Sequence, residues 1–202
     1  FPYTTLFRSY GLHVQVVNDN QAILLAEFLF GAFKRTPDMI VVRVGNGIGA
    51  GIMCNGQLLH GHGTGVGEIG HVVVVENGER CTCGNRGCLE TVASSRAVVK
   101  RAKAMAQQQP DSYLHKLAPT LDKITIEMVI EAFQAGDETL QPLVTDVGHH
   151  LGQMMANLVG IFGRPRIMLC GSVTGFGKPL FDVIRAEVSQ RSLSGRINEP
   201  QI

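Results

Sequence analysis

The chain has 202 residues with a formal net charge of +1, and charged residues make up 17% of it, against about 25% in an average soluble protein. So small a net charge argues against nucleic-acid binding by charge within this chain, because it provides no field to hold a polyanion. The apolar runs 39–42 and 72–75 are far shorter than the roughly 18 residues of a membrane span, and a 45% hydrophobic content argues against disorder.

Hydrophobic periodicity and turn residues predict mainly strands in the first half of the chain and helices in the second. Residues 1–9 show neither a structural period nor the features of a signal peptide, so we expect a foreign or disordered tail. Asn20 is expected to cap the first helix. The predicted elements are, in chain order, strand 14–17, helix 22–30, strands 39–44, 52–54, 57–59 and 72–75, helices 91–107, 125–136 and 137–162, strand 167–170 and helix 179–190. This order predicts an α/β fold with a mixed sheet flanked by helices.

Three of the five cysteines, Cys81, Cys83 and Cys88, lie close together on a glycine-containing loop. Zinc normally takes four ligands and is well suited by thiolate and imidazole, so His71 is the nearest candidate for the fourth ligand. A disulfide is the competing interpretation, but it would leave one of the three cysteines unpaired, and no secretory signal is present. We therefore predict a zinc site.

Two carboxylates flank this cysteine cluster, Glu68 before it and Glu90 after it. A metal loop would bring both close to His71, and carboxylates are good acceptors for the hydroxyl groups of a sugar. A histidine can bind a metal through one ring nitrogen and donate from the other. Taken singly, each residue is more often a surface carboxylate or a core histidine. Asp19 is either a general base or hydroxyl acceptor, or part of a helix-capping cluster.

The glycine-rich segment 45–51 follows a predicted strand. Its glycines allow the close backbone approach that suits a phosphate group, but a hairpin would use the same glycines. Gly45, Asn46, Gly47 and Gly49 are therefore weak candidates for phosphate binding.

The segment Gly67-Glu68-Ile69-Gly70-His71, followed by CTCGNRGCLE over 81–90, resembles the signature of the ROK family (repressors, open reading frames and sugar kinases). The resemblance runs from about residue 11 to about residue 190. It implies an actin-like ATPase, ribonuclease H-like fold with two lobes. The chain would then supply the end of the first lobe, residues 1–38, and most of the second, residues 39–202, truncated at its end.

The resemblance also implies a role for individual residues. In the family, one set of positions holds a structural zinc and a second, overlapping set binds the sugar. The zinc positions are His71, Cys81, Cys83 and Cys88, and the sugar positions are Asn18, Asp19, Glu68, His71 and Glu90. The Asp19 position is the catalytic base of the family's kinases, the loop at Gly45 matches a phosphate loop, and Cys170-Gly171-Ser172 matches an adenosine-binding glycine pair.

Departures from the kinase pattern favour a regulator. Kinases of the family usually carry threonine where this chain has Asn46, and only one glycine precedes Ser172 in the adenosine region. The amino-terminal phosphate loop is expected upstream of this chain. We therefore predict the sugar-sensing domain of a transcriptional repressor, similar to xylose or N-acetylglucosamine repressors. The alternative is a glucokinase-like sugar kinase that uses ATP and Mg²⁺.

The expected partners follow from this prediction. The ligand would be a monosaccharide, and DNA would be bound only through a helix-turn-helix domain upstream of the chain. We expect no membrane association, a cytoplasmic location, and a homodimer or homotetramer.

Overall fold

The computed structural model describes residue 11 and residues 18–61, 65–163 and 165–192. The predicted strand over 14–17 and the predicted tail over 1–9 lie outside the described residues. Among the described helices, none combines the length and the apolar character that a bilayer crossing requires.

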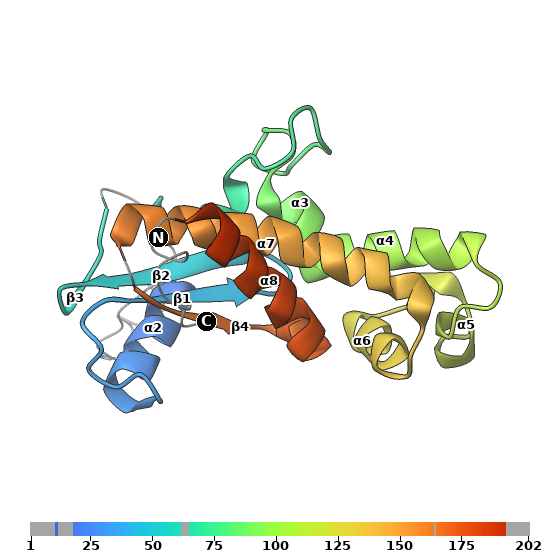
Figure 1. Cartoon of the computed structure of the whole chain (residues 1–202), viewed down its shortest axis with the longest axis horizontal. Helices are drawn as coiled ribbons and strands as arrows, with labels where there is room; N and C mark the ends of the chain where they lie inside the picture. Colours follow the sequence, from blue (N-terminus) through green and yellow to red (C-terminus); the bar gives the residue numbers. More distant parts are fainter. Residues whose placement is uncertain (1–10, 12–17, 62–64, 164, 193–202) are drawn as a thin grey trace.

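The apolar run MIVVRV forms β1 (Met39–Val44), an inner strand of the sheet (Figure 1). It pairs in antiparallel fashion with β2 (Ile48–Cys54), which continues into β3 (Gln57–Leu58), and in parallel with β4 (Arg166–Cys170). Within the described residues the strand order is β3-β2-β1-β4. The predicted mixed sheet is therefore confirmed.

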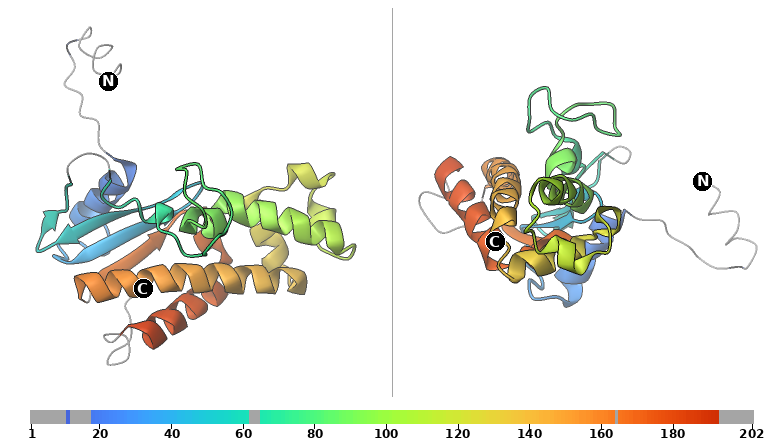
Figure 2. Two further views of the ribbon diagram at one scale, coloured as in Figure 1. Left: turned by 90° about the horizontal axis from the view of Figure 1, so that it is seen from above. Right: turned by 90° about the vertical axis from the view of Figure 1, so that its right-hand side faces the viewer.

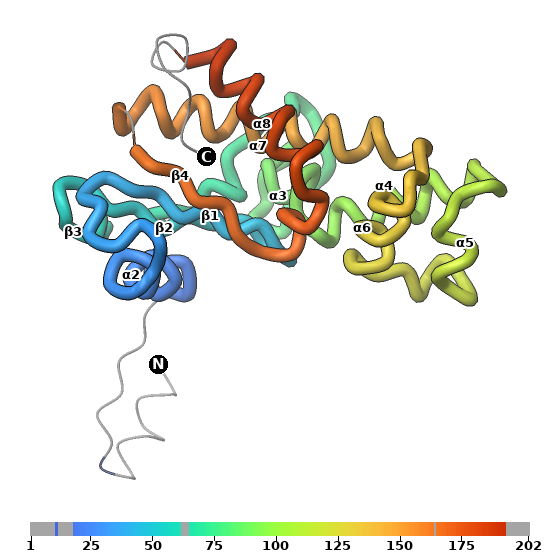
Figure 3. Tube along the Cα trace, turned by 60° about the horizontal axis from the view of Figure 1, so that its bottom comes forward, coloured from blue at the N-terminus to red at the C-terminus, as the bar shows by residue number. Residues whose placement is uncertain are grey.

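The two faces of the sheet carry separate hydrophobic clusters, because side chains alternate along a strand. Val42 belongs to the large core that includes α7 (Gln141–Phe162), whereas Val41 belongs to a smaller cluster with α2 (Asp19–Phe30). Figures 2 and 3 show α7 and α8 (Lys178–Arg191) on one side of the sheet and α2 on the other. Residues on α2 therefore reach the sheet from the face opposite to the main core.

The helices that lie between β3 and β4 along the chain form a layer that extends past the end of the sheet (Figure 1). Its helices before α7 are α3 (Leu89–Ala93), α4 (Ser95–Gln108), α5 (Leu114–Leu117) and α6 (Ile126–Gln134). Single turns of 3-10 helix occur at η1 (Ile69–His71), η2 (Leu121–Lys123), η3 (Glu138–Leu140) and η4 (Ser172–Phe176). The predicted helices over 125–136, 137–162 and 179–190 are confirmed as α6, as η3 with α7, and as α8.

The predicted strand over 72–75 is wrong. The backbone of this segment bonds to the loop that follows it: Leu89 N donates to the Val72 carbonyl at 2.9 Å, and Val74 N donates to the Gly87 carbonyl at 2.8 Å. Among the described residues, this segment forms a single isolated antiparallel bridge, between Val73 and Cys88. Four consecutive valines favour an extended chain, but tertiary pairing with the cysteine loop keeps them out of the sheet.

Two helix boundaries also differ from the prediction. The helix expected over 91–107 is two helices, because Ser94 adopts an extended backbone and its hydroxyl accepts from Ala97 N at 3.2 Å, which caps α4. Asn18, not Asn20, caps α2: its side-chain oxygen accepts from Asn20 N at 2.9 Å and Gln21 N at 3.4 Å. Asp19 therefore lies in the first turn of the helix.

The interface of α8 with α7 contains a buried carboxylate, Glu187, which is hydrogen-bonded to His149 Nδ1 at 2.7 Å and to Arg191 Nε. Burial raises the pKa of Glu187, but the hydrogen bonds from Arg191 and His149 outweigh burial, so the pKa lies below its ordinary value. A lowered folded-state pKa means that this group stabilises the fold above its ordinary pKa and that the stabilisation is lost as the pH falls.

We therefore expect Glu187→Gln to reduce the loss of thermal stability on acidification from about pH 5 to about pH 3. Thermal melts of both proteins across this range measure the effect. Glu131→Gln, a change at an exposed position of α6, serves as the control. If the melting temperature of Glu187→Gln fell with pH as steeply as that of the unmodified protein, the expectation would be contradicted.

Candidate functional site

His71, Cys81, Cys83 and Cys88 form a compact cluster in which the four ligand atoms lie within 4.8 Å of one another. Cys81 Sγ lies 3.5 Å from His71 Nδ1, and Cys83 Sγ lies 3.7 Å from Cys88 Sγ. In a tetrahedral zinc site with ordinary bond lengths, sulfur lies about 3.5 Å from nitrogen and about 3.8 Å from sulfur. The two measured separations match those edges, so this cluster could bind a metal ion of that size and geometry.

Two glycines shape the loop that carries the cysteines. Gly84 and Gly87 have φ of +99° and +71°, a region that favours glycine. A Cβ on Gly87 would lie 1.7 Å from the Val75 carbonyl oxygen, so the loop passes directly against the preceding segment. Cys81 N donates to the Asn85 carbonyl at 2.8 Å and closes the tip of the loop. The loop holds the three thiols in place through its own backbone.

The thiols differ in how readily they lose a proton. Burial raises the pKa of Cys81, but hydrogen bonds from the backbone and side chain of Cys83 and from His71 and Cys88 outweigh it and lower the pKa to about 7. Burial, together with the neighbouring thiols, raises the pKa of Cys88 to about 12. A cation at the centre of the cluster would favour the thiolate form of every ligand, so metal binding should release protons.

The first residues of β2 join the segments that carry the predicted sugar-binding residues. Ile48 N donates to Glu90 Oε2 at 3.2 Å, and Ala50 N donates to the Gly67 carbonyl at 2.7 Å. A Cβ on Gly67 would lie 1.9 Å from the Ala50 carbonyl oxygen. The segment that contains Glu68 therefore packs closely on β2 at Ala50, two residues along the strand from Ile48, which binds Glu90.

The start of α2 reaches the same strand from the other side. A Cβ on Gly49 would lie 2.3 Å from Asn20 Nδ2, and one on Gly51 would lie 2.5 Å from the Asn20 carbonyl oxygen. Beside this contact, Asp19 Oδ2 pairs with Arg43 Nη1 of β1 at 2.5 Å. Small residues on β2 thus allow α2 to place Asn18 and Asp19 near the strand that binds Glu90.

Asp19 and Glu90 are predicted sugar carboxylates that form ion pairs, and Glu90 is the more buried of them. Its side chain is 13% exposed, whereas the Asp19 side chain is 63% exposed. Its Oε1 accepts from Arg96 Nη2 at 2.9 Å, and Arg96 Nε donates to the Asn46 carbonyl at 2.8 Å. Arg96 therefore links the carboxylate to the turn between β1 and β2. The side chains of Asp19, Glu68 and Glu90 form no hydrogen bonds with one another among the described residues.

The predicted loop over 45–51 is shorter than expected, because β2 already begins at Ile48 and Gly49 pairs with Arg43 inside the sheet. The remaining turn is bound to α4: Ser95 N donates to the Gly45 carbonyl at 2.8 Å, and Ser95 Oγ donates to Asn46 Oδ1 at 3.0 Å. A Cβ on Gly47 would lie 2.8 Å from Glu90 Oε2. Glycine at position 47 thus makes room for Glu90, independently of any phosphate.

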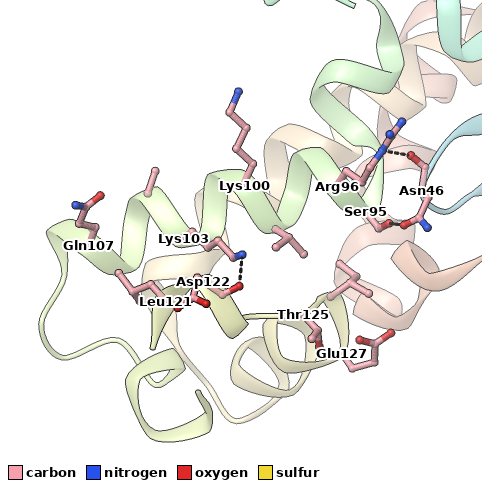
Figure 4. Close-up of a pocket in the computed structure, with 13 residues that line it drawn as sticks. Asn46, Ser95, Arg96, Lys100, Lys103, Gln107, Leu121, Asp122, Thr125 and Glu127 are labelled. Carbon is pink, nitrogen blue, oxygen red and sulfur yellow. Dashed lines mark hydrogen bonds between the residues drawn. The ribbon is translucent and has the colours of Figure 1, made fainter. Parts of the chain in front are cut away.

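A cavity of about 880 Å³ opens beside this turn, between α4 and the start of α6 (Figure 4). Asn46, Ser95 and Arg96 line its end at the turn, and Lys100 and Lys103 lie farther along α4. Lys103 Nζ donates to the Asp122 carbonyl at 2.8 Å across the cavity. Arg96 therefore lines the cavity and also binds the Glu90 carboxylate.

Arg43 and Arg96 were not predicted from the sequence, although each pairs with a predicted sugar carboxylate. One signal was available for Arg43, since it is the only charged residue in the apolar run MIVVRV. The region matched to an adenosine-binding pair has a local structural role: Gly171 has φ of +104°, and a Cβ there would lie 2.4 Å from the Val44 carbonyl oxygen.

Comparison with known proteins identifies close relatives of two kinds. A model described as the ROK family matches residues 3–201. The N-acetylglucosamine repressor of Escherichia coli is 37% identical over 188 residues, which are 93% of this chain and 45% of the relative. The chain thus spans less than half the length of that repressor.

Two solved structures superpose with a TM-score of 0.84 and confirm the predicted actin-like ATPase fold. One is a ROK family transcriptional regulator, a homologue of the Escherichia coli Mlc protein, at 33% identity over 93% of this chain and 46% of that one. The other is a glucokinase from Streptomyces griseus in complex with glucose and AMPPNP, at 32% identity over 95% of this chain and 62% of that one.

Proposed function

Because the chain belongs to the ROK family, we propose that it is the sugar-sensing part of a transcriptional repressor. One observation supports sensing over catalysis: the turn expected to bind phosphate is already engaged by the protein. Its Asn46 bonds to Ser95 and Arg96, and the space above Gly47 is filled by Glu90. The relatives that are repressors support the same proposal.

In this proposal the monosaccharide is held by the predicted sugar residues, Asn18, Asp19, Glu68, His71 and Glu90. The ion-paired carboxylates of Asp19 and Glu90 supply hydrogen-bond acceptors for sugar hydroxyls. Because the segments that carry the five residues meet at the start of β2, a sugar bound there would link them. Sugar binding would then shift the population toward a closed arrangement of the two lobes.

We also propose that the His71, Cys81, Cys83 and Cys88 cluster holds zinc. The donor set and the measured separations fit that ion. When bound, the ion supplies a rigid crosslink and stabilises the thiolates. His71 faces the cluster through Nδ1, which leaves Nε2 as the nitrogen that donates to a sugar hydroxyl.

Further parts of the proposal concern the whole protein. Residues 1–38 belong to the first lobe and residues 39–202 to the second, and DNA is contacted only by a helix-turn-helix domain upstream of this chain. The protein acts in the cytoplasm as a homodimer or homotetramer. The net charge of +1 agrees with DNA contacts that lie outside this chain.

The second candidate function is a sugar kinase that uses ATP and Mg²⁺, with Asp19 as the base. The cavity beside Asn46 favours it, because a volume of about 880 Å³ next to a turn matched to a phosphate loop is large enough for a nucleotide. The Streptomyces griseus glucokinase, solved with glucose and AMPPNP, supports this candidate.

Calorimetry and an enzyme assay on the full-length protein distinguish the two functions. We expect D-xylose, D-glucose or N-acetyl-D-glucosamine to bind, and Asp19→Asn to weaken binding about 10- to 100-fold, because a charged acceptor is lost. A coupled ADP-release assay with ATP and Mg²⁺ should show no turnover. Turnover that Asp19→Asn abolishes would instead establish the kinase. Asp182→Asn, an exposed change on α8, is the control.

A further inference from the structure

Arg43 is a charged residue in the apolar strand β1, and no part of the proposed function uses it. Its side chain leaves the sheet on the face of Val41, toward α2, because alternate residues of a strand share a face. Its register partners are Gly49 on β2 and Cys170 on β4. A glycine and a small thiol leave room for a guanidinium group at the edge of the predicted sugar site.

The contacts of Asp19 explain what this guanidinium does. Asp19 Oδ2 pairs with Arg43 Nη1 at 2.5 Å, and Asp19 Oδ1 accepts from Asn20 N at 2.9 Å. Each oxygen therefore has one partner, which fixes the rotation of the carboxylate about its side-chain bond. A carboxylate has about four acceptor positions, so about two of them remain for a ligand.

Stability does not explain the pair. The side chains of Arg43 and Asp19 are 41% and 63% exposed, and exposed ion pairs contribute little to folding. The pair lies at the start of α2, beside a residue proposed to bind sugar, and an oriented acceptor binds a ligand with a smaller loss of side-chain entropy. Replacement of Arg43 should therefore leave the fold intact and change ligand binding.

We propose that Arg43 is a positioning residue that holds the Asp19 carboxylate in the orientation in which it accepts a hydrogen bond from a sugar hydroxyl. The inference rests on the proposed function, since Asp19 is a proposed sugar contact. Arg43 acts through Asp19 and does not itself touch the sugar. Its loss should weaken sugar binding about 3- to 10-fold, the usual effect of freeing one flexible side chain.

The experiment is a double-mutant cycle on the full-length protein, with calorimetric titration of D-xylose, D-glucose and N-acetyl-D-glucosamine. We expect Arg43→Gln to weaken binding about 3- to 10-fold and Arg43→Lys to weaken it less, because lysine keeps the charge and loses the fork geometry. In the Asp19→Asn background, Arg43→Gln should change the affinity less than about twofold. Lys178→Gln, which removes an exposed ion pair on α8, is the control and should have no effect.

Unchanged affinity in Arg43→Gln would overturn the proposal, and so would an equal loss in the Asp19→Asn background, since Arg43 would then act independently of Asp19. If the unmodified protein binds none of the three sugars, the proposed function fails, and a second measurement still tests Arg43. The carboxyl ¹³C resonance of Asp19 in labelled protein should shift in Arg43→Gln and stay unchanged in Lys178→Gln. A resonance that does not move in Arg43→Gln overturns the positioning role.

Discussion

Cys83→Ser is expected to reduce the zinc content of the purified protein from about one ion per chain to almost none, because a structural site needs all four of its ligands. The loop would lose the crosslink that the proposed zinc provides, and the His71 ring would lose the ion proposed to fix its orientation. We therefore expect sugar affinity to fall about tenfold, the lower end of the roughly 10- to 100-fold losses of metal affinity or activity that follow when the support of a metal ligand is removed. The melting temperature should fall by several degrees.

Elemental analysis, calorimetry with the three sugars and thermal melts measure these effects. Cys54→Ser is the matched control, because Cys54 lies at the end of β2 and outside the cluster. It should keep both zinc and sugar affinity. If Cys83→Ser lost its zinc but bound sugar normally, the coupling between the metal loop and the sugar site would be wrong. If the unmodified protein contained no zinc under reducing conditions, the zinc proposal itself would fail.

Gly67→Ala is expected to destabilise the fold by about 3 kcal/mol or more, since two independent penalties combine at this residue. Its φ is +88°, which disfavours any side chain, and the new Cβ would lie 1.9 Å from the Ala50 carbonyl oxygen. That oxygen belongs to a central strand and cannot move aside. The segment with Glu68 would be displaced from β2, so sugar binding should be lost together with stability.

Gly56→Ala separates the two penalties. Gly56 has a similar φ of +74° in the hairpin between β2 and β3, but nothing lies within 4 Å of its Cβ position. It should cost only about 1 kcal/mol, the backbone penalty alone. Denaturant unfolding compares the two variants directly. Equal losses would show that the packing of the Gly67 segment on Ala50 contributes nothing, and that Glu68 is positioned in some other way.

Local sequence patterns predicted most of the elements. Strand MIVVRV and the helices α6, α7 and α8 follow from hydrophobic periodicity and turn residues, which depend on neighbours along the chain. The predicted strand over 72–75 was wrong because that prediction rested on local composition alone. The four valines favour a strand, but their backbone pairs with the cysteine loop. Asn18 took the cap predicted for Asn20, because several Asx residues in a row offer equivalent local bonds.

The sequence by itself predicted the four residues of the candidate metal site. Cys81, Cys83 and Cys88 are so close along the chain that a turn brings them together, and His71 is the nearest histidine that could supply the fourth ligand. The structure places their four ligand atoms within 4.8 Å of one another. Close sequence spacing limits the possible arrangements, which is why this part of the site could be predicted.

The tertiary structure alone decided which groups the predicted sugar carboxylates bind. Arg43 is 24 residues from Asp19, and the Ile48 N–H that binds Glu90 is 42 residues away from it. No local pattern encodes such pairs, because they form only when α2 packs on the β1–β2 hairpin and the Glu90 side chain of α3 reaches the start of β2. The sequence therefore predicted which residues would bind a metal and a sugar, while packing around β2 decided how the charged groups among them are oriented and held.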